Sequence, residues 1–250
     1  MTAPAHPPLR YAVLASGGGS NFQALLDRSD SGDLPAQAVF VASNNSKSGA
    51  LEKATTAGVP AYHVSSVSLE SAKMLKQTLA DAPVTPIRPS EWESAALLLL
   101  LEEHEPDLLV LAGYMKKVPD AVLERMKNRV VNIHPALLPK YGGAGMYGHH
   151  VHEAVVKAGE PFGGMTIHMV NEHYDEGQIV AQRRVGVEGA DAAEAARRVL
   201  ALEHDTYWRV LKGFADGDIV PTGSDDPARA VEISPRWRDA MRALPGTVFP

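Results

Sequence analysis

The sequence predicts an α/β fold built on a doubly wound, mostly parallel sheet. Three observations predict it. Short apolar runs alternate with helix-length segments through the first half of the chain, the runs are apolar at successive positions, and a glycine-rich loop follows the first run. Alternating strands and helices are typical of βαβ units, and continuous apolarity is typical of strands that helices cover on both faces.

Five runs of strand length carry this pattern. They are YAVLA at 11–15, AVFVA at 38–42, AYHV at 61–64, LLVLA at 108–112 and VVNI at 130–133. Helices are expected in NFQALLDR after the first run and in SEWESAALLLLLEEHEPD before the fourth, where Ser90 can cap the helix and Pro106 ends it. The three prolines of the stretch 80–90 predict a surface connection.

The pattern changes after residue 164. MTIHMV at 165–170 and QIVAQRRV at 178–185 are strand-like runs joined by seven residues, so we expect an antiparallel pair in the C-terminal half. Apolar residues at helical spacing then predict a long helix from 191 to 214, which Gly217 ends.

Length and composition allow one large domain. The chain has 250 residues and 45% hydrophobic content, which is enough for a sizeable core. We place the catalytic domain at 8–220 and a C-terminal tail at 221–250, in which Ser234 and Pro235 can open a short helix.

Charge and cysteine content exclude several classes of function. The net charge is -6, with both signs scattered along the chain, so we expect no nucleic-acid partner. The chain has no cysteine, which excludes disulfides, thiolate metal sites and a cysteine nucleophile. The first ten residues lack the pattern of a secretory signal, and no apolar run approaches the roughly 18 residues of a membrane span. We therefore expect a cytoplasmic protein without a membrane partner.

The loop ASGGGSNFQAL places glycines between a buried strand and a helix. Free N–H groups at the helix start, with Gly19, Ser20 and Asn21, can bind a phosphate there. The spacing fits neither the dinucleotide nor the triphosphate motif, so a terminal monophosphate is favoured. The alternative is a flexible turn in which Ser20 or Asn21 serves only as a helix N-cap.

Asn132 and His134 end the fifth run. Residues two apart in a strand point to the same face, so both side chains should project together at the carboxyl end of the sheet. An amide and an imidazole can both donate to a developing oxyanion, and the imidazole can also transfer a proton. The alternative is a structural histidine bonded to a carbonyl and an asparagine that closes a turn.

The connection NEHYDEG offers three acids that can reach His134, namely Glu172, Asp175 and Glu176. A carboxylate within about 4–6 Å raises the pKa of an imidazole, because it favours the charged form. Spacing alone does not choose among the three, and all three can instead be solvated acids of a hairpin loop.

A histidine cluster raises the question of a metal. His149, His150 and His152 lie close together in GHHVHEAV. The zinc-protease motif is absent, and His149 with His152 supply at most two ligands on one helix face, so we expect no metal.

Five segments together resemble a known family. SGGGSNFQAL, AGYMKKV, NIHPALLPKYGG, TIHMVNEHYDEGQIVAQ and LEHDTYWRVL occur in the order typical of the phosphoribosylglycinamide formyltransferases of purine synthesis, across roughly residues 10–220. The resemblance implies a Rossmann-like formyltransferase fold. It also implies two small-molecule substrates, glycinamide ribonucleotide and 10-formyltetrahydrofolate as co-substrate, and a monomer or homodimer.

The resemblance also assigns roles to individual residues. It implies that Gly19, Ser20 and Asn21 hold the substrate phosphate and that Glu203 contacts the glycinamide or ribose. It selects Asp175 as the acid that tunes His134, beside Asn132 near the formyl oxygen. The implied folate pocket is lined by Asn132 and by a run of four residues, Met115, Lys116, Lys117 and Val118.

The implied reaction is direct attack of the ribonucleotide amine on the formyl carbon, through a tetrahedral intermediate held by Asn132 and protonated His134. The alternative is a 10-formyltetrahydrofolate hydrolase that releases formate, since the same Asn, His and Asp would serve it. Methionyl-tRNA formyltransferases share part of the pattern but add a C-terminal domain for which this chain lacks room. A non-enzymatic nucleotide-phosphate sensor would leave Asn132, His134 and Asp175 without a role.

Overall fold

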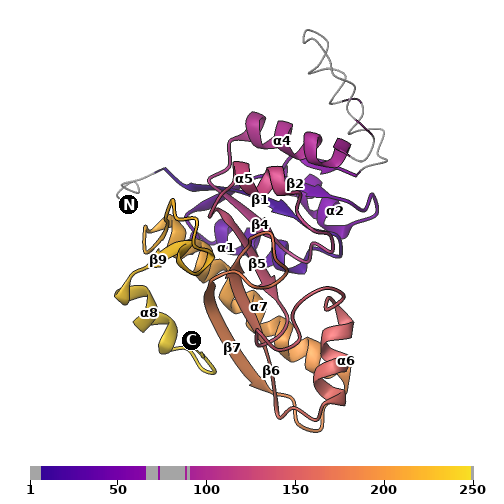
Figure 1. Cartoon of the computed structure of the whole chain (residues 1–250), viewed down its shortest axis with the longest axis vertical. Coiled ribbons are helices and arrows are strands. Elements are labelled where there is room, and N and C mark those ends of the chain that lie inside the picture. Colours follow the sequence, from indigo (N-terminus) through magenta and orange to yellow (C-terminus); the bar gives the residue numbers. More distant parts are fainter. Residues whose placement is uncertain (1–6, 66–72, 74–87, 89–90, 249–250) are drawn as a thin grey trace.

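A computed structural model describes residues 7–65, 73, 88 and 91–248. One seven-stranded sheet crosses the molecule in the order β3-β2-β1-β4-β5-β6-β7 (Figure 1). Its strands are β1 (Leu9–Leu14), β2 (Ala36–Ser43), β3 (Ala61–His63), β4 (Leu108–Leu111), β5 (Val130–His134), β6 (Phe162–Met169) and β7 (Ile179–Gly186). Pairing is parallel from β3 to β5 and antiparallel from β5 to β7, so the predicted mixed α/β sheet is confirmed.

Helices cover both faces of the sheet. They are α1 (Ser20–Asp30), α2 (Gly49–Thr56), α4 (Trp92–His104), α5 (Asp120–Arg125), α6 (His149–Lys157), α7 (Ala192–Ala215) and α8 (Pro235–Arg242). Successive residues of β1 enter different layers, with Tyr11 in the core beneath α1 and α7 and Ala12 in the core beneath α4 and α5. Burial on both faces explains why the strand runs are continuously apolar.

The predicted helix ends follow local chemistry. At the start of α7, Asp191 accepts a hydrogen bond from the N–H of Glu194, and Gly217 follows the helix with φ 72°. At the end of α4, Glu105 takes φ 43° before Pro106, which cannot continue a helix. Ser90 and most of the proline-rich stretch 80–90 lie outside the described residues.

The residues after α7 pack onto the sheet and α7. A short antiparallel pair, β8 (Ile219–Pro221) with β9 (Val231–Ile233), was not predicted, and a 3₁₀ turn (Pro227–Arg229) lies between its strands. The expected helix α8 is present: Ser234 accepts from the N–H of Trp237 at its start, and Trp237 and Met241 are buried in the larger core. Arg183 of β7 donates to the carbonyl of Pro245.

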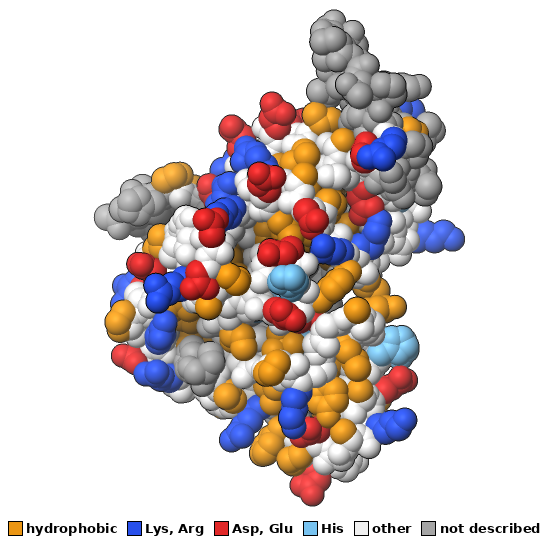
Figure 2. Space-filling view, in the orientation of Figure 1, with side chains coloured by type: hydrophobic (Ala, Val, Ile, Leu, Met, Phe, Trp, Pro, Cys, Tyr) orange, Lys and Arg blue, Asp and Glu red, His pale blue; other side chains and the backbone are white. Residues whose placement is uncertain are grey.

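The surface carries both signs of charge. Lys and Arg side chains alternate with Asp and Glu over the face drawn in Figure 2. Within the described residues, no helix has the length and apolarity that a membrane span requires.

Candidate active site

A cleft of about 630 Å³ opens at the carboxyl ends of the parallel strands. Four connections line it: the glycine loop (17–21) after β1, the lysine loop (112–118) after β4, the loop from 143 to 148 between β5 and α6, and the loop from 171 to 175 between β6 and β7. Helices α6 and α7 supply further lining residues. This is the edge at which doubly wound sheets bind ligands.

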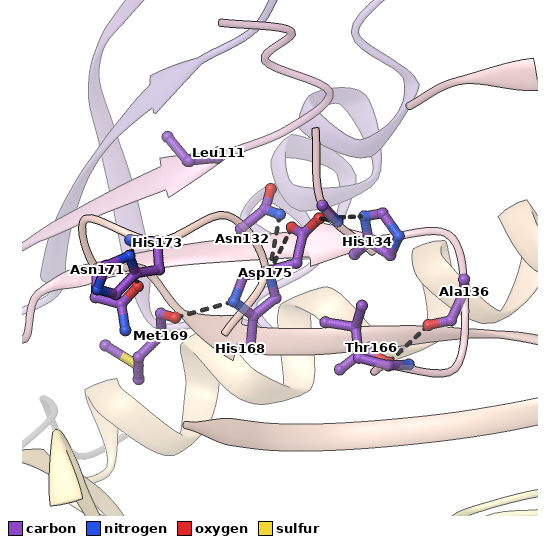
Figure 3. Close-up of polar contacts among 12 residues, drawn as sticks. Leu111, Asn132, His134, Ala136, Thr166, His168, Met169, Asn171, His173 and Asp175 are labelled. Atoms are coloured by element: carbon purple, nitrogen blue, oxygen red, sulfur yellow. Dashed lines mark hydrogen bonds and ion pairs between the residues drawn. The ribbon is translucent and has the colours of Figure 1, made fainter. Parts of the chain in front are cut away.

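His134, Asn132 and Asp175 converge inside this cleft (Figure 3). The Nδ1 atom of His134 lies 3.7 Å from Oδ2 of Asp175, and its Nε2 atom lies 2.8 Å from the carbonyl oxygen of Tyr141. Asp175 sits in a left-handed turn with φ 58° and accepts a hydrogen bond of 2.8 Å from the N–H of Gly143. The end of β5 and an acid of the β6–β7 loop therefore lie close together, as expected.

Of the three acids between β6 and β7, the geometry identifies Asp175 as the one that lies beside His134. Asp175 is half-buried and faces the imidazole, whereas Glu172 and Glu176 are exposed. Glu172 instead lies 3.8 Å from the neighbouring His173. A carboxylate held away from solvent interacts more strongly with a buried imidazole than a solvated one does.

His168 is a site residue that the sequence analysis did not assign. Strand register places it directly opposite Asn132 across the β5–β6 pair. Its Nδ1 donates to the carbonyl of Met169 at 2.9 Å, and its Nε2 lies 3.0 Å from the amide nitrogen of Asn132 and 3.5 Å from Oδ1 of Asp175. When Nδ1 carries the only ring proton, Nε2 accepts one amide hydrogen of Asn132, and the second amide hydrogen remains for a ligand. The antiparallel pairing of MTIHMV with VVNIH was the signal that could have identified it.

The turn after β5 is held by a threonine. Thr166 donates to the carbonyl of Ala136 at 2.6 Å and accepts from the N–H of Leu138 at 3.1 Å (Figure 3). Both bonds are buried, so they fix the direction in which the chain leaves His134.

The electrostatics of His134 differ from the sequence-based expectation. Burial lowers the pKa of His134 by more than Asp175 and the Tyr141 carbonyl raise it, so the net direction is downward. For Asp175, burial raises the pKa, but His168, His134 and the Gly143 N–H together lower it further. The carboxylate does favour the imidazolium as expected, but desolvation outweighs it in the free protein.

The glycine loop lines the cleft, and its carbonyl and N–H groups differ in their hydrogen bonding. The carbonyl of Gly17 accepts from Ser48 Oγ at 2.8 Å, and the carbonyl of Ser16 accepts from Asn45 at 3.1 Å, so both carbonyls are bound on the α2 side. Within the described part of the chain, none of the N–H groups from 17 to 21 has an assigned hydrogen bond. They can therefore bind an anion at the start of α1.

Asn21 contacts Glu203 across the cleft wall. Its Nδ2 donates to Glu203 Oε2 at 2.7 Å, and its Oδ1 is buried without a hydrogen-bond partner among the described residues. The helix begins after Gly19 with no side-chain cap among these residues, so the alternative of Ser20 or Asn21 as a mere N-cap is not what the structure has. Asn21 and Glu203 both line the cleft.

Glu203 is a buried acid, with 7% of its surface exposed, on the cleft side of α7. Burial raises its pKa to about 7, against a smaller lowering by Asn21. Its protonation therefore changes near neutral pH, and among the described residues its assigned hydrogen-bond partner is Asn21.

Replacing Glu203 with glutamine is expected to stabilise the protein at high pH. The folded pKa lies above the unfolded one, so the contribution of the protonated carboxyl is complete below pH 4.5 and is lost as the pH rises through about 7. The full shift corresponds to about 3 kcal/mol. Thermal melts at pH 5 and 8 should show Glu203→Gln gaining clearly more stability relative to the wild type at pH 8 than at pH 5; an equal change at both pH values would contradict the buried charge.

The lysine loop lines the other side of the cleft. All four predicted residues lie on it, with Met115 half exposed and Val118 buried. Lys116 forms an ion pair with Glu93, which also accepts from Tyr114 at 2.8 Å, and Lys117 lies 3.0 Å from Asp120. Glu93 and Asp120 therefore hold the two lysines of the loop, while Met115 lines the cleft and is half exposed.

The histidines near α6 separate into two groups. His152 is buried in the cleft wall, where burial and then His134 lower its pKa. His149 lies instead with His150 and Glu153, and one potential ligand atom from each falls within 4.8 Å of the others. The pair considered from the sequence, His149 and His152, is thus not the pair brought together. All three grouped residues are exposed at the positive N-terminal end of α6, which disfavours a cation.

Fold and site together define an α/β enzyme whose cleft, at the carboxyl ends of the parallel strands, holds Asn132, His134 and Asp175 beside a glycine loop. A family model described as formyl transferase matches residues 9–211. A chloroplastic phosphoribosylglycinamide formyltransferase of Arabidopsis thaliana is 37% identical, over 84% of this chain and 68% of that protein. The corresponding enzyme of Haemophilus influenzae is 32% identical, over 83% of this chain and 88% of that protein. The chain belongs to the formyl transferase family, in its phosphoribosylglycinamide formyltransferase branch.

Further comparisons agree with this placement. The chain spans 62% of the length of the chloroplastic phosphoribosylglycinamide formyltransferase of Vigna unguiculata, with 36% identity. The crystal structure of glycinamide ribonucleotide transformylase 1 from Symbiobacterium toebii matches with a TM-score of 0.73 and 34% identity, covering 91% of this chain and 94% of that one. A formyltetrahydrofolate deformylase from Pseudomonas syringae shares the fold at 24% identity, with a TM-score of 0.69 over 92% of this chain and 67% of that one.

Proposed function

We propose that this protein transfers the formyl group of 10-formyltetrahydrofolate to the primary amine of glycinamide ribonucleotide. The observation that carries the proposal is one continuous cleft with an anion-binding glycine loop at one part of its wall and the Asn132, His134 and Asp175 group at another. A phosphorylated amine could be anchored by its phosphate while its amine reaches a carbonyl beside His134. The name of one relative, the human trifunctional purine biosynthetic protein adenosine-3, supports a role in purine synthesis.

The two substrates would bind at the glycine loop and the lysine loop of the cleft. The N–H groups of Gly19, Ser20 and Asn21 would hold the phosphate at the start of α1. Glu203, which Asn21 contacts, would accept a hydrogen bond from a hydroxyl or amine of the same substrate. Met115 and Val118, with the stems of Lys116 and Lys117, would contact the folate.

Chemistry would begin when the ribonucleotide amine attacks the formyl carbon and negative charge forms on its oxygen. Asn132 would donate its free amide hydrogen to that oxygen, because His168 holds the other one. The neutral imidazole of His134 would accept the proton lost by the amine and donate to the oxyanion as imidazolium. Burial lowers the pKa of His134 in the free protein, and the carboxylate of Asp175 partly offsets this effect. The negative charge that forms on the substrate oxygen would raise the pKa of His134 further and so favour the imidazolium.

Collapse of the tetrahedral adduct would expel the folate nitrogen, and His134 would return its proton to that leaving group. General acid–base transfer of this kind contributes roughly 10² to 10⁴ in rate. The step forms one C–N bond and breaks another without a covalent enzyme intermediate, and it requires no metal.

The rival function is hydrolysis of the same folate. One assay separates the two: consumption of 10-formyltetrahydrofolate is followed with and without glycinamide ribonucleotide. Transfer predicts consumption only when the ribonucleotide is present. Formate release at an equal rate in its absence would favour the hydrolase and reject the proposal.

The glycine loop offers a test of the phosphate anchor. Gly19 has φ 72°, and a Cβ there would lie 2.7 Å from Cα of Ala50, so Gly19→Ala should displace the loop. A left-handed backbone costs alanine about 1–2 kcal/mol, and we expect about tenfold weaker ribonucleotide binding in titration calorimetry. Gly32→Ala is the matched control, because Gly32 has φ 81° with no atom near its Cβ among the described residues. Equal losses in both variants would contradict the assignment.

The assembly is proposed as a monomer or homodimer acting on small molecules alone. A cytoplasmic compartment remains a prediction from the sequence. Two of the plant relatives are named as chloroplastic proteins.

A further inference from the structure

Ser16 lies where the glycine loop and the lysine loop meet. Its hydroxyl donates to Oδ1 of Asn44 at 2.5 Å and accepts from the N–H of Met115 at 2.9 Å. Its own N–H donates to the carbonyl of Gly113 at 3.0 Å. Ser16 is buried, with 8% of its surface exposed, and it directly precedes Gly17.

The orientation of this hydroxyl is fixed by its partners. A serine hydroxyl has a single hydrogen, and here Asn44 takes it. The oxygen therefore presents its lone pairs to Met115, and the bond cannot reverse. Asn44 follows β2, so one side chain joins the chain segments that leave β1, β2 and β4.

The hydrogen bond from Met115 to Ser16 connects the glycine loop with the lysine loop. Met115 is half exposed at the opening, in the lysine loop, while the N–H groups of the glycine loop begin one residue after Ser16. A ligand that pulls the lysine loop inward would therefore also pull on Ser16 and on the start of the glycine loop. Coupling between sites requires a shared element of this kind whose position both ligands bias.

We propose that Ser16 is a positioning residue that couples ribonucleotide binding at the glycine loop to folate binding at the lysine loop. The inference rests on the proposed function, since it assigns those two ligands to those two loops. Each ligand should tighten the binding of the other, by the same factor in both directions.

Titration calorimetry can measure this coupling without turnover, by using glycinamide ribonucleotide with tetrahydrofolate, which carries no formyl group. Couplings of this type are about 5- to 150-fold, and we expect a wild-type value within that range. Ser16→Ala should bring the factor close to one and raise the KM of both substrates more than it lowers kcat. Ser16→Thr, which keeps the hydroxyl, should restore the coupling.

Ser48→Ala is the matched control. Ser48 donates to the carbonyl of Gly17 at 2.8 Å and so supports the glycine loop without contacting the lysine loop in any assigned bond. It should weaken ribonucleotide binding and leave the coupling factor unchanged. Asn44→Ala, which releases the hydroxyl, is a second variant and should lower the coupling even if Ser16→Ala folds poorly.

The outcomes separate the two proposals. Wild-type coupling in Ser16→Ala, or equal loss of coupling in Ser48→Ala, would overturn the role of Ser16. Wild-type protein that binds both ligands independently would overturn it as well and leave the function standing. Wild-type protein that binds neither ligand would instead reject the proposed function.

Discussion

Replacing His134 with alanine is expected to lower kcat by about 10² to 10⁴ while the Kd of each substrate changes little. The imidazole is 4% exposed and lies between the Tyr141 carbonyl and Asp175. In the proposed mechanism it is both the proton carrier and one oxyanion donor, so its substitution would remove both. Neither loop assigned to ground-state binding contains His134. Steady-state rates and calorimetric titrations on the same preparation measure both quantities.

The matched control for this variant is His150→Ala. His150 is an exposed histidine of α6 that does not line the cleft among the described residues, and it should retain wild-type kcat. A large rise in substrate Kd for His134→Ala with unchanged kcat would show that the residue binds substrate and does not take part in the chemical step.

Asp175→Asn is expected to lower kcat by about 10- to 1000-fold, because removing a nearby carboxylate lowers a histidine pKa by roughly 1 to 3 units. Asparagine tolerates the left-handed turn at φ 58° and can still accept from Gly143. The substitution therefore removes charge while keeping shape. Burial already lowers the pKa of His134, so without Asp175 the imidazolium needed in the transition state is harder to form.

Glu176→Gln tests whether this effect is specific. Glu176 is the exposed acid beside Asp175, and neutralising it should change kcat by less than about twofold, because exposed charges are well screened. Comparable losses in Asp175→Asn and Glu176→Gln would mean that the loop acts through its net charge and not through one carboxylate.

The fold was largely predictable from the sequence because strand and helix signals are local. Buried strands show as continuous apolar runs, and the long helix α7 shows in its 3.6-residue period. The short pair β8–β9 was missed, since three-residue strands in a polar tail carry almost no periodicity. Its stability depends on packing against α7, which no local pattern encodes.

The site was predictable in part for a related reason. Asn132 and His134 share a strand, so their common face follows from a period of two. The choice of Asp175, the role of His168 and the Asn21–Glu203 bond depend on contacts between distant segments. The pKa of His134 was expected to rise because a charge can be inferred from sequence, whereas the depth of burial that lowers it cannot.

The most direct measurement uses 10-formyltetrahydrofolate labelled with ¹³C in the formyl group, mixed with an excess of glycinamide ribonucleotide. If the cleft performs direct transfer, the label will appear in formylated ribonucleotide in a 1:1 ratio with tetrahydrofolate formed. Label recovered as free formate, or tetrahydrofolate formed without formylated ribonucleotide, would contradict it.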